Sequence, residues 1–177
     1  MPARTVLLAF AFAVLSTPWL ASLDSTGGLR TDPTQATAPQ APPGEALDVR
    51  VVTDEPEAVL AIARKRKAGE RIGEDDWARL FASEGYVRLK KREASLQRAF
   101  SDEEFKAFVL SAKTLDAAET YRAQLAGWKT LDARAAAAVA LRYLPAGTRL
   151  RGRIYPSIKP RENSFVFELT TDPAIFF

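Results

Sequence analysis

Apolar residues recur with the three- and four-residue spacing of amphipathic helices between about residues 54 and 144. A first helix is predicted to begin at Asp54-Glu55-Pro56, whose acidic turn suits the positive end of a helix dipole, and to end at Gly69. The same spacing predicts further helices from about Gly73-Glu74, over Tyr86 to Ala99, from Ser101, through Ala118 to Trp128, and from Asp132 to Leu144.

Each predicted helix presents one apolar face, which we expect to form the core. Ser101 and Glu104 have the spacing of a capping box, in which each side chain accepts a hydrogen bond from the backbone N–H of the other residue. The residues expected to be buried are Val59, Ile62, Ala63, Trp77, Leu80, Phe81, Leu89, Leu96, Phe100, Phe105, Phe108, Val109, Ala112, Ala118, Tyr121, Leu125 and Trp128.

After Gly147 the pattern changes to the two-residue alternation of β-strands. Strands are predicted over Thr148 to Ile158, Ser164 to Leu169 and Ala174 to Phe177, and a short one over Leu47 to Val52. Helices at about 54–144 followed by strands at about 148–177 indicate an α+β domain over residues 46–177, with a helical region preceding a small antiparallel sheet.

The N-terminal residues have the parts of a secretory signal peptide. Arg4 precedes the apolar run Val6 to Leu15, which is short for a membrane span, and Ser16-Thr17-Pro18 end the run. We interpret residues 1–22 as a cleaved signal rather than an anchor, and the Pro-, Thr- and Ala-rich residues 23–45 as a disordered linker. The predicted location is secreted or periplasmic, with no stable membrane span after cleavage.

Composition limits the chemistry that this chain can perform. The sequence has no histidine and no cysteine, so it cannot build a Ser-His or Cys-His nucleophile or a zinc site with the usual ligands. Its net charge of +3 is too small to indicate a nucleic-acid partner or an anionic membrane surface. No residue is assigned a catalytic, cofactor-binding or metal-ligating role.

The strongest charged feature is the stretch from Arg142 to Arg161, with six basic residues and no acidic one. Arg149, Arg151 and Arg153 alternate along the predicted strand, so they would share one face and could bind an anionic ligand or an acidic partner. The alternative is that they form salt bridges with acidic helix starts such as Asp102-Glu103, or face water.

Other charged runs have structural explanations. The acidic clusters Glu74-Asp75-Asp76 and Asp102-Glu103-Glu104 are expected to cap helices rather than to bind a metal. The basic runs Arg64 to Lys67 and Lys90 to Arg92 are expected to be solvated helix surfaces.

Three stretches resemble the N-terminal part of a bacterial family of exported, predicted zinc-dependent peptidases, a domain of unknown function. They are Trp77 to Leu96 (WARLFASEGYVRLKKREASL), Ser101 to Leu110 (SDEEFKAFVL), and Leu144 to Leu169 with LPAGTRLRGRIYPSIKP and NSFVFEL. The resemblance implies a peptidase whose zinc is held by a His-Glu-x-x-His helix after the strands, and a peptide or protein substrate.

This chain stops at Phe177 before such a helix would begin, on the apolar run Ala174 to Phe177. We therefore expect it to be the N-terminal fragment of a secreted zinc-dependent metallopeptidase, an incomplete metallopeptidase-like domain that lacks zinc and activity by itself. The family resemblance also suggests that Ser164 to Leu169, or the strand at Ala174, would pair with extended substrate, although both could equally be ordinary core strands. The alternative function is a complete, non-enzymatic periplasmic or secreted binding domain that uses the basic strand face.

Overall fold

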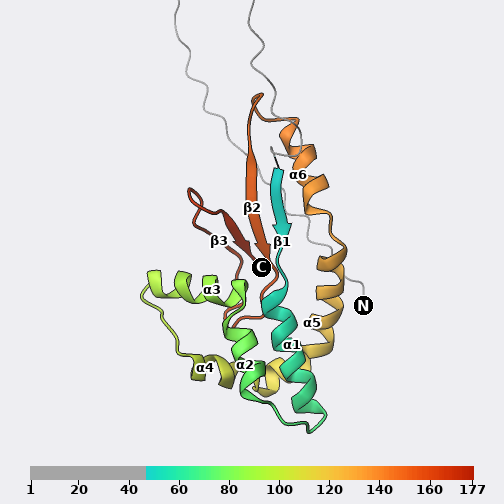
Figure 1. Cartoon of the computed structure of the whole chain (residues 1–177), viewed down its shortest axis with the longest axis vertical. Coiled ribbons are helices and arrows are strands. Elements are labelled where there is room, and N and C mark those ends of the chain that lie inside the picture. Colours follow the sequence, from blue (N-terminus) through green and yellow to red (C-terminus); the bar gives the residue numbers. More distant parts are fainter. Residues whose placement is uncertain (1–46) are drawn as a thin grey trace, which may run out of the picture. The chain divides into compact units, whose positions relative to one another are not determined.

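The computed structural model of the chain describes residues 47–177, so the predicted signal peptide (1–22) and linker (23–45) lie outside the described residues. The α+β fold class is confirmed, with helices between a first strand and three later strands (Figure 1). The helices are α1 (Asp54–Lys67), α2 (Glu74–Phe81), α3 (Glu84–Ser95), α4 (Asp102–Val109), α5 (Ala112–Thr130) and α6 (Ala133–Leu141). The strands are β1 (Leu47–Val51), β2 (Leu150–Tyr155), β3 (Phe165–Phe167) and β4 (Ala174–Phe176).

The helical core forms around α1, which packs against α2, α3, α4 and α5. Its apolar face is buried as predicted, including Val59, Ile62 and Ala63. Local signals fix the helix starts: Ser101 and Glu104 form the expected capping box, and the Ser111 hydroxyl accepts a hydrogen bond from Thr114 N–H.

Three helix predictions were wrong in detail. Leu96 follows the last turn of α3 and is exposed, because the chain leaves the helix with Gln97 at a φ of 56°. Ala112 is exposed because Ser111 starts a new helix there, so the apolar face that begins at Phe105 ends at Val109. Helix α6 ends at Leu141 rather than Leu144.

The sheet is mixed, with strand order β1-β2-β4-β3, so the prediction of an antiparallel sheet was wrong. Strand β2 pairs in parallel with both β1 and β4, and only β3 and β4 are antiparallel. The connection from Pro156 to Ser164 carries the chain past one strand position, and β4 then fills the space between β2 and β3. The direction of β4 relative to β2 depends on the path of this connection. The alternation of apolar and polar residues within the strands does not predict that path.

Strand β4 is therefore an inner strand, paired on both sides. Phe176 is fully buried between the stacked rings of Tyr155 and Phe165, with ring centroids 4.6 and 4.7 Å away. The apolar run at Ala174 to Phe177 therefore leaves no strand edge unpaired at Ala174–Phe176, because β2 and β3 flank this strand.

One face of the sheet is fastened to α3 by Arg88. Its guanidinium donates to the Tyr155 hydroxyl at 3.1 Å and forms ion pairs with Asp172 at 2.7 Å and Glu168 at 2.9 Å. Helix α6 packs on β1, the strand at the other end of the sheet from β3. Within residues 47–177, the helices fall short of the length and apolar character that a membrane crossing requires.

Candidate functional site

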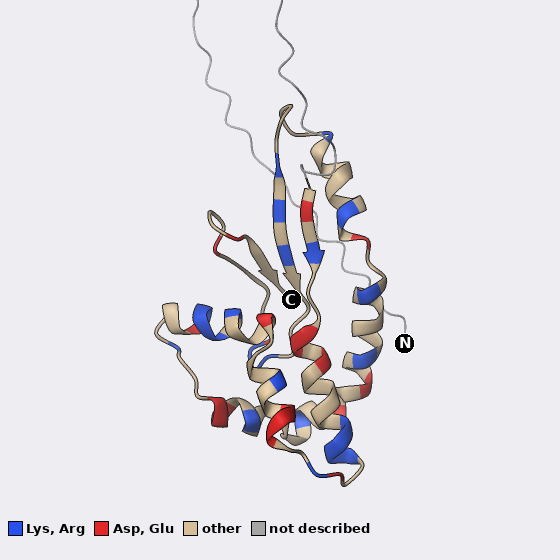
Figure 2. Ribbon diagram, viewed as in Figure 1, with Lys and Arg blue, Asp and Glu red and all other residues tan. Residues whose placement is uncertain are grey.

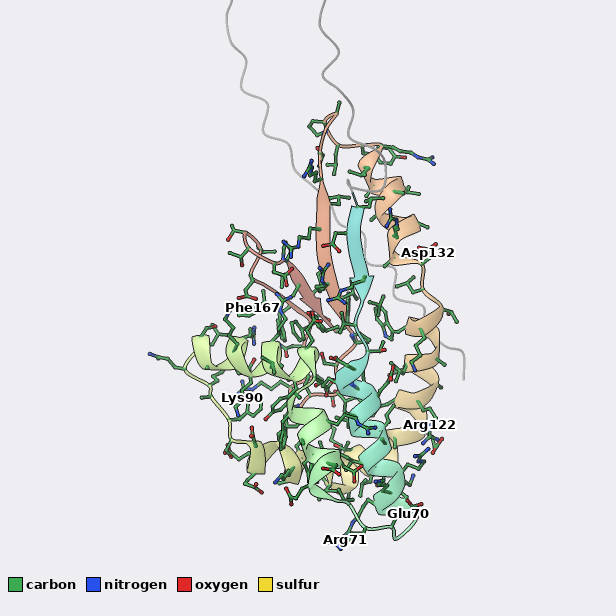
Figure 3. The ribbon with its side chains drawn as sticks, in the orientation of Figure 1. Glu70, Arg71, Lys90, Arg122, Asp132 and Phe167 are labelled. Atoms are coloured by element: carbon green, nitrogen blue, oxygen red, sulfur yellow. The ribbon has the colours of Figure 1, made fainter. Side chains whose placement is uncertain are left out.

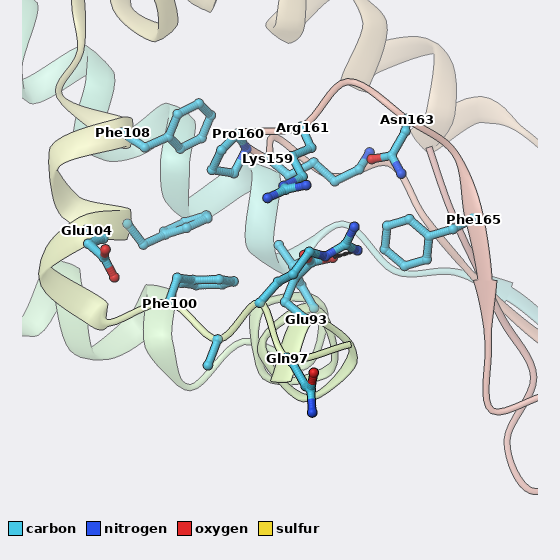
Figure 4. Close-up of a pocket in the computed structure, with 14 residues that line it drawn as sticks. Glu93, Gln97, Phe100, Glu104, Phe108, Lys159, Pro160, Arg161, Asn163 and Phe165 are labelled. Atoms are coloured by element: carbon cyan, nitrogen blue, oxygen red, sulfur yellow. Dashed lines mark hydrogen bonds and ion pairs between the residues drawn. The ribbon is translucent and has the colours of Figure 1, made fainter. Parts of the chain in front are cut away.

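A cavity of about 550 Å³ opens where α3 and α4 meet the β2–β3 connection (Figure 4). This size is typical of sites for small organic ligands. Its walls come from separate parts of the chain, and its apolar side chains are Leu89, Phe100, Phe105, Phe108, Pro160 and Phe165. We call it the Lys159 pocket.

An aromatic cluster makes one wall of the Lys159 pocket. Phe100 and Phe105 stack with centroids 5.6 Å apart, and Phe108 lies 5.6 Å from Phe105. Phe105 is fixed from behind by an edge contact to Tyr86 at 4.9 Å. The opposite wall is Phe165 (Figure 4). The Arg92 guanidinium lies 3.8 Å from the centre of the Phe165 ring. The rings are thus held in place before any ligand arrives.

The acidic side chains in the pocket already have partners. Glu93 is buried and pairs with Arg92, and Arg98 Nε lies 3.0 Å from Glu93 Oε2. Glu104 accepts hydrogen bonds from the backbone N–H and hydroxyl of Ser101, which lower the pKa of its carboxyl. The charge of Glu93 is therefore balanced by two arginines, whereas the exposed Glu104 stays charged and forms no ion pair with Lys159 or Arg161.

Three polar side chains on that connection face the aromatic wall without partners of their own. Lys159, Arg161 and Asn163 have no side-chain hydrogen bond or ion pair with any residue in 47–177, while the Lys159 Nζ lies 5.8 Å from the centre of the Phe165 ring. Figure 4 shows Lys159 and Arg161 over the pocket, with Phe108 on one side and Asn163 on the other. Desolvation lowers the pKa of Lys159, the nearby Glu55 carboxyl partly opposes this effect, and Arg92 lowers the pKa further.

A buried carboxyl supports this connection from below. Glu55, at the start of α1, accepts a hydrogen bond from Ile158 N–H at 3.1 Å and is 1% exposed. Its Oε1 has no partner, and desolvation raises the pKa of the carboxyl to about 8. Glu55 is thus mostly protonated at neutral pH and holds the residue next to Lys159.

The predicted basic strand face is not a free surface. Arg153 is buried and forms two hydrogen bonds of 2.9 Å to the Asp48 carboxylate, which lower the pKa of that carboxyl. Arg151 lies 3.4 Å from Asp48 and 3.3 Å from Asp172. Arg149 precedes β2 and is exposed, and Arg151 is exposed despite these two ion pairs.

The arginines do form salt bridges, but with different carboxylates from those suggested. Parallel pairing of β1 with β2 places Asp48 opposite Arg151, whereas Asp102 on α4 pairs with Lys90 and accepts from the Tyr86 hydroxyl at 2.6 Å. Figure 2 shows the basic positions along β2 next to β1.

The acidic helix starts act as caps, as expected. The Asp76 carboxylate accepts from Gly73 N–H at 2.9 Å and pairs with Lys65 at 2.7 Å. Among residues 47–177, no three His, Cys, Asp or Glu side chains come together as a metal site would require.

Comparison of the chain with family models, with curated proteins and with solved structures found no match. The resemblance to zinc-dependent peptidases therefore stays a prediction from the sequence.

The topology also decides which strands could take part in substrate pairing. The strand at Ala174 is unavailable because both of its edges are paired. Strand β3 is an edge strand, with β4 as its one partner in the described sheet.

The sequence analysis placed Lys159 to Asn163 between two predicted strands and did not predict the pocket. The available signal was the acid-free basic stretch from Arg142 to Arg161, which includes Lys159 and Arg161. The sequence did not indicate that Phe100 and Phe108, more than fifty residues earlier, belong to the aromatic wall of the same pocket.

Proposed function

We propose that this chain is a non-enzymatic binding domain of an exported protein, and that the Lys159 pocket holds a small organic anion with an apolar or aromatic body. The observation that carries the proposal is the pair of unpartnered cations, Lys159 and Arg161, facing an aromatic wall. The signal-like N-terminus supports the exported location.

The chemistry of the pocket favours a carboxylate over a neutral ligand. Glu93 is paired with Arg92 and Arg98, and Glu162 on the β2–β3 connection is paired with Lys113, so Lys159 and Arg161 give this connection an excess of positive charge. Hydrogen bonds from cations to a carboxylate are stronger than those between neutral groups, particularly where aromatic walls reduce solvent screening. The ligand's apolar body would lie between Phe100, Phe108 and Phe165, where burial of its surface adds affinity.

The test is an NMR titration of the full chain with 3-phenylpropionate, and with 3-phenylpropionamide as its neutral match. We expect backbone amide shifts centred on residues 159–165 and an affinity about tenfold weaker for the amide, because the amide cannot form the charge-assisted contacts. Arg161→Gln should weaken binding of the acid by about five- to tenfold.

Arg71→Gln is the matched control, because Arg71 is likewise exposed and lies on the connection between α1 and α2 (Figure 3). It should leave binding unchanged. Equal affinity for acid and amide, or shifts that avoid residues 159–165, would contradict the proposal.

The sequence likeness supports a second function, in which the chain is the leading part of a zinc-dependent metallopeptidase. Peptide hydrolysis by a metal-activated water would then need a His-Glu-x-x-His helix beyond Phe177. Reading the genomic DNA past the Phe177 codon tests this function: an open frame reaching that motif supports it, and an immediate stop codon rejects it. Zinc bound stoichiometrically to the present chain would contradict the expectation that it lacks a metal site.

A further inference from the structure

Helix α6 is the most apolar helix of the described domain, and yet most of it is exposed. Ala133 is buried and Ala137 and Leu141 are half-buried, four residues apart, so one narrow face packs on β1. The other face carries Val139, which is 49% exposed, and continues into Tyr143, which is 85% exposed, and Leu144. Large apolar side chains gathered at one end of a domain indicate a surface that contacts something else.

The same end of the domain is positively charged. No acidic residue occurs between Asp132 and Glu162, and the exposed Arg142 and Arg149 bracket the connection from α6 to β2. Neither arginine has an ion-pair partner within residues 47–177. Figure 2 shows α6 and the start of β2 without acidic positions. We call Val139, Arg142, Tyr143, Leu144 and Arg149 the α6 end surface.

The described domain also begins at this end. Leu47, the first residue of β1, pairs with Leu150 at the start of β2, next to the connection that follows α6.

We propose that the α6 end surface binds peripherally to an anionic phospholipid membrane. Tyrosine, aliphatic side chains and arginine together suit the lipid headgroup region, where the ring and aliphatic groups enter the boundary and the guanidinium groups meet lipid phosphates. Contact of this kind needs no spanning helix. The exposed arginines and the absence of acidic residues favour a membrane with anionic headgroups over a membrane of neutral lipids.

The test exploits the absence of native cysteines, because a single introduced cysteine can be labelled in the full chain. Val139→Cys and Val87→Cys are matched, since Val87 on α3 is 51% exposed. Each is labelled with an environment-sensitive nitrobenzoxadiazole and titrated with phosphatidylglycerol–phosphatidylcholine vesicles and with pure phosphatidylcholine vesicles. We expect a blue shift and intensity gain at position 139 with anionic vesicles alone, and none at position 87.

A second arm tests the charge. Arg142→Glu with Arg149→Glu should raise the lipid concentration needed for the position-139 signal by at least about 25-fold, since each basic residue near an anionic surface contributes about fivefold. Arg66→Glu with Arg71→Glu makes the same change in net charge at two exposed residues at and after the end of α1, and should shift the titration less than about threefold.

Three results would overturn the proposal. They are no signal at position 139 with anionic vesicles, equal signals at positions 139 and 87, or an equal loss from the two charge-reversal pairs. The first of these would leave an acidic protein as the better partner for the α6 end surface. None depends on ligand binding in the Lys159 pocket.

Discussion

At the scale of single residues, Glu55 is the most unusual group in the described domain. It is a fully buried carboxyl whose Oε1 lacks a partner, and its one hydrogen bond comes from Ile158 N–H. A buried carboxyl is retained at low cost only while protonated, so its contribution to stability depends on pH.

Glu55→Gln is expected to change the pH dependence of folding. Burial raises the pKa of Glu55 from 4.5 to about 8, so between these values the folded state keeps a proton that the unfolded state releases. The unfolded state then binds fewer protons, and the free energy of unfolding falls as pH rises, by roughly 1 kcal/mol per pH unit. Urea unfolding at pH 5, 6, 7 and 8 should show this slope in the wild type and a weaker one in Glu55→Gln. Parallel curves for the two proteins would refute the assignment.

At the scale of elements, the position of α3 depends on a close approach to α1. The first turn of α3 contains Gly85, where an added Cβ would lie 2.9 Å from Glu55 Cβ and 3.5 Å from Tyr155 Cδ1. Ser83 caps the helix, and the Asp54 carboxylate accepts from the N–H of Glu84 at 2.5 Å. The glycine is therefore needed for the distance between the two helices and not for an unusual φ.

Gly85→Ala should lower the free energy of unfolding by about 1 to 2 kcal/mol, because overpacking outweighs the gain in helix propensity. Gly127→Ala is the matched control, since Gly127 lies inside α5 and an added Cβ there meets nothing within 4 Å. It should raise the free energy of unfolding by about 0.5 to 1 kcal/mol. Chemical denaturation of both variants measures the difference, and the same sign for both would contradict the close approach.

At the scale of the whole described domain, one side chain connects the helical layer to the end of the sheet. Arg88 on α3 is largely buried and contacts Tyr155 on β2 and both Glu168 and Asp172 in the β3–β4 turn. These partners are 67 to 84 residues away in sequence. The two short strands β3 and β4 are therefore held partly from outside the sheet.

Arg88→Ala should destabilise the domain by about 1 to 3 kcal/mol, because it removes a buried guanidinium and its hydrogen bonds to Tyr155, Glu168 and Asp172. Lys91 and Arg151 still pair with the two carboxylates, which limits the loss. The loss should be concentrated at β3 and β4, which hydrogen exchange of their backbone amides would detect. Arg79→Ala, at an exposed position of α2, is the control and should change stability by less than about 0.5 kcal/mol. Uniform exchange across all strands in Arg88→Ala would argue against a local connection.

The candidate site was predictable only in its charge. The sequence showed that basic residues cluster between Arg142 and Arg161. It could not show which of these side chains form ion pairs in the folded domain and which do not. Asp48 lies about a hundred residues before Arg153, and parallel pairing of β1 with β2 brings the two together. Lys159 and Arg161 form no side-chain hydrogen bond or ion pair within residues 47–177, so both remain available at the pocket.

The sequence by itself determined the helices, their capping residues, most of their buried faces and the α+β class, because these follow from local spacing and from hydrogen bonds within a few residues. Only the tertiary structure decided strand order and direction, the inner position of β4 and the Lys159 pocket. Each of these depends on contacts between residues far apart in the chain, where the length and path of a connection, rather than the pattern of the strands, select the partner.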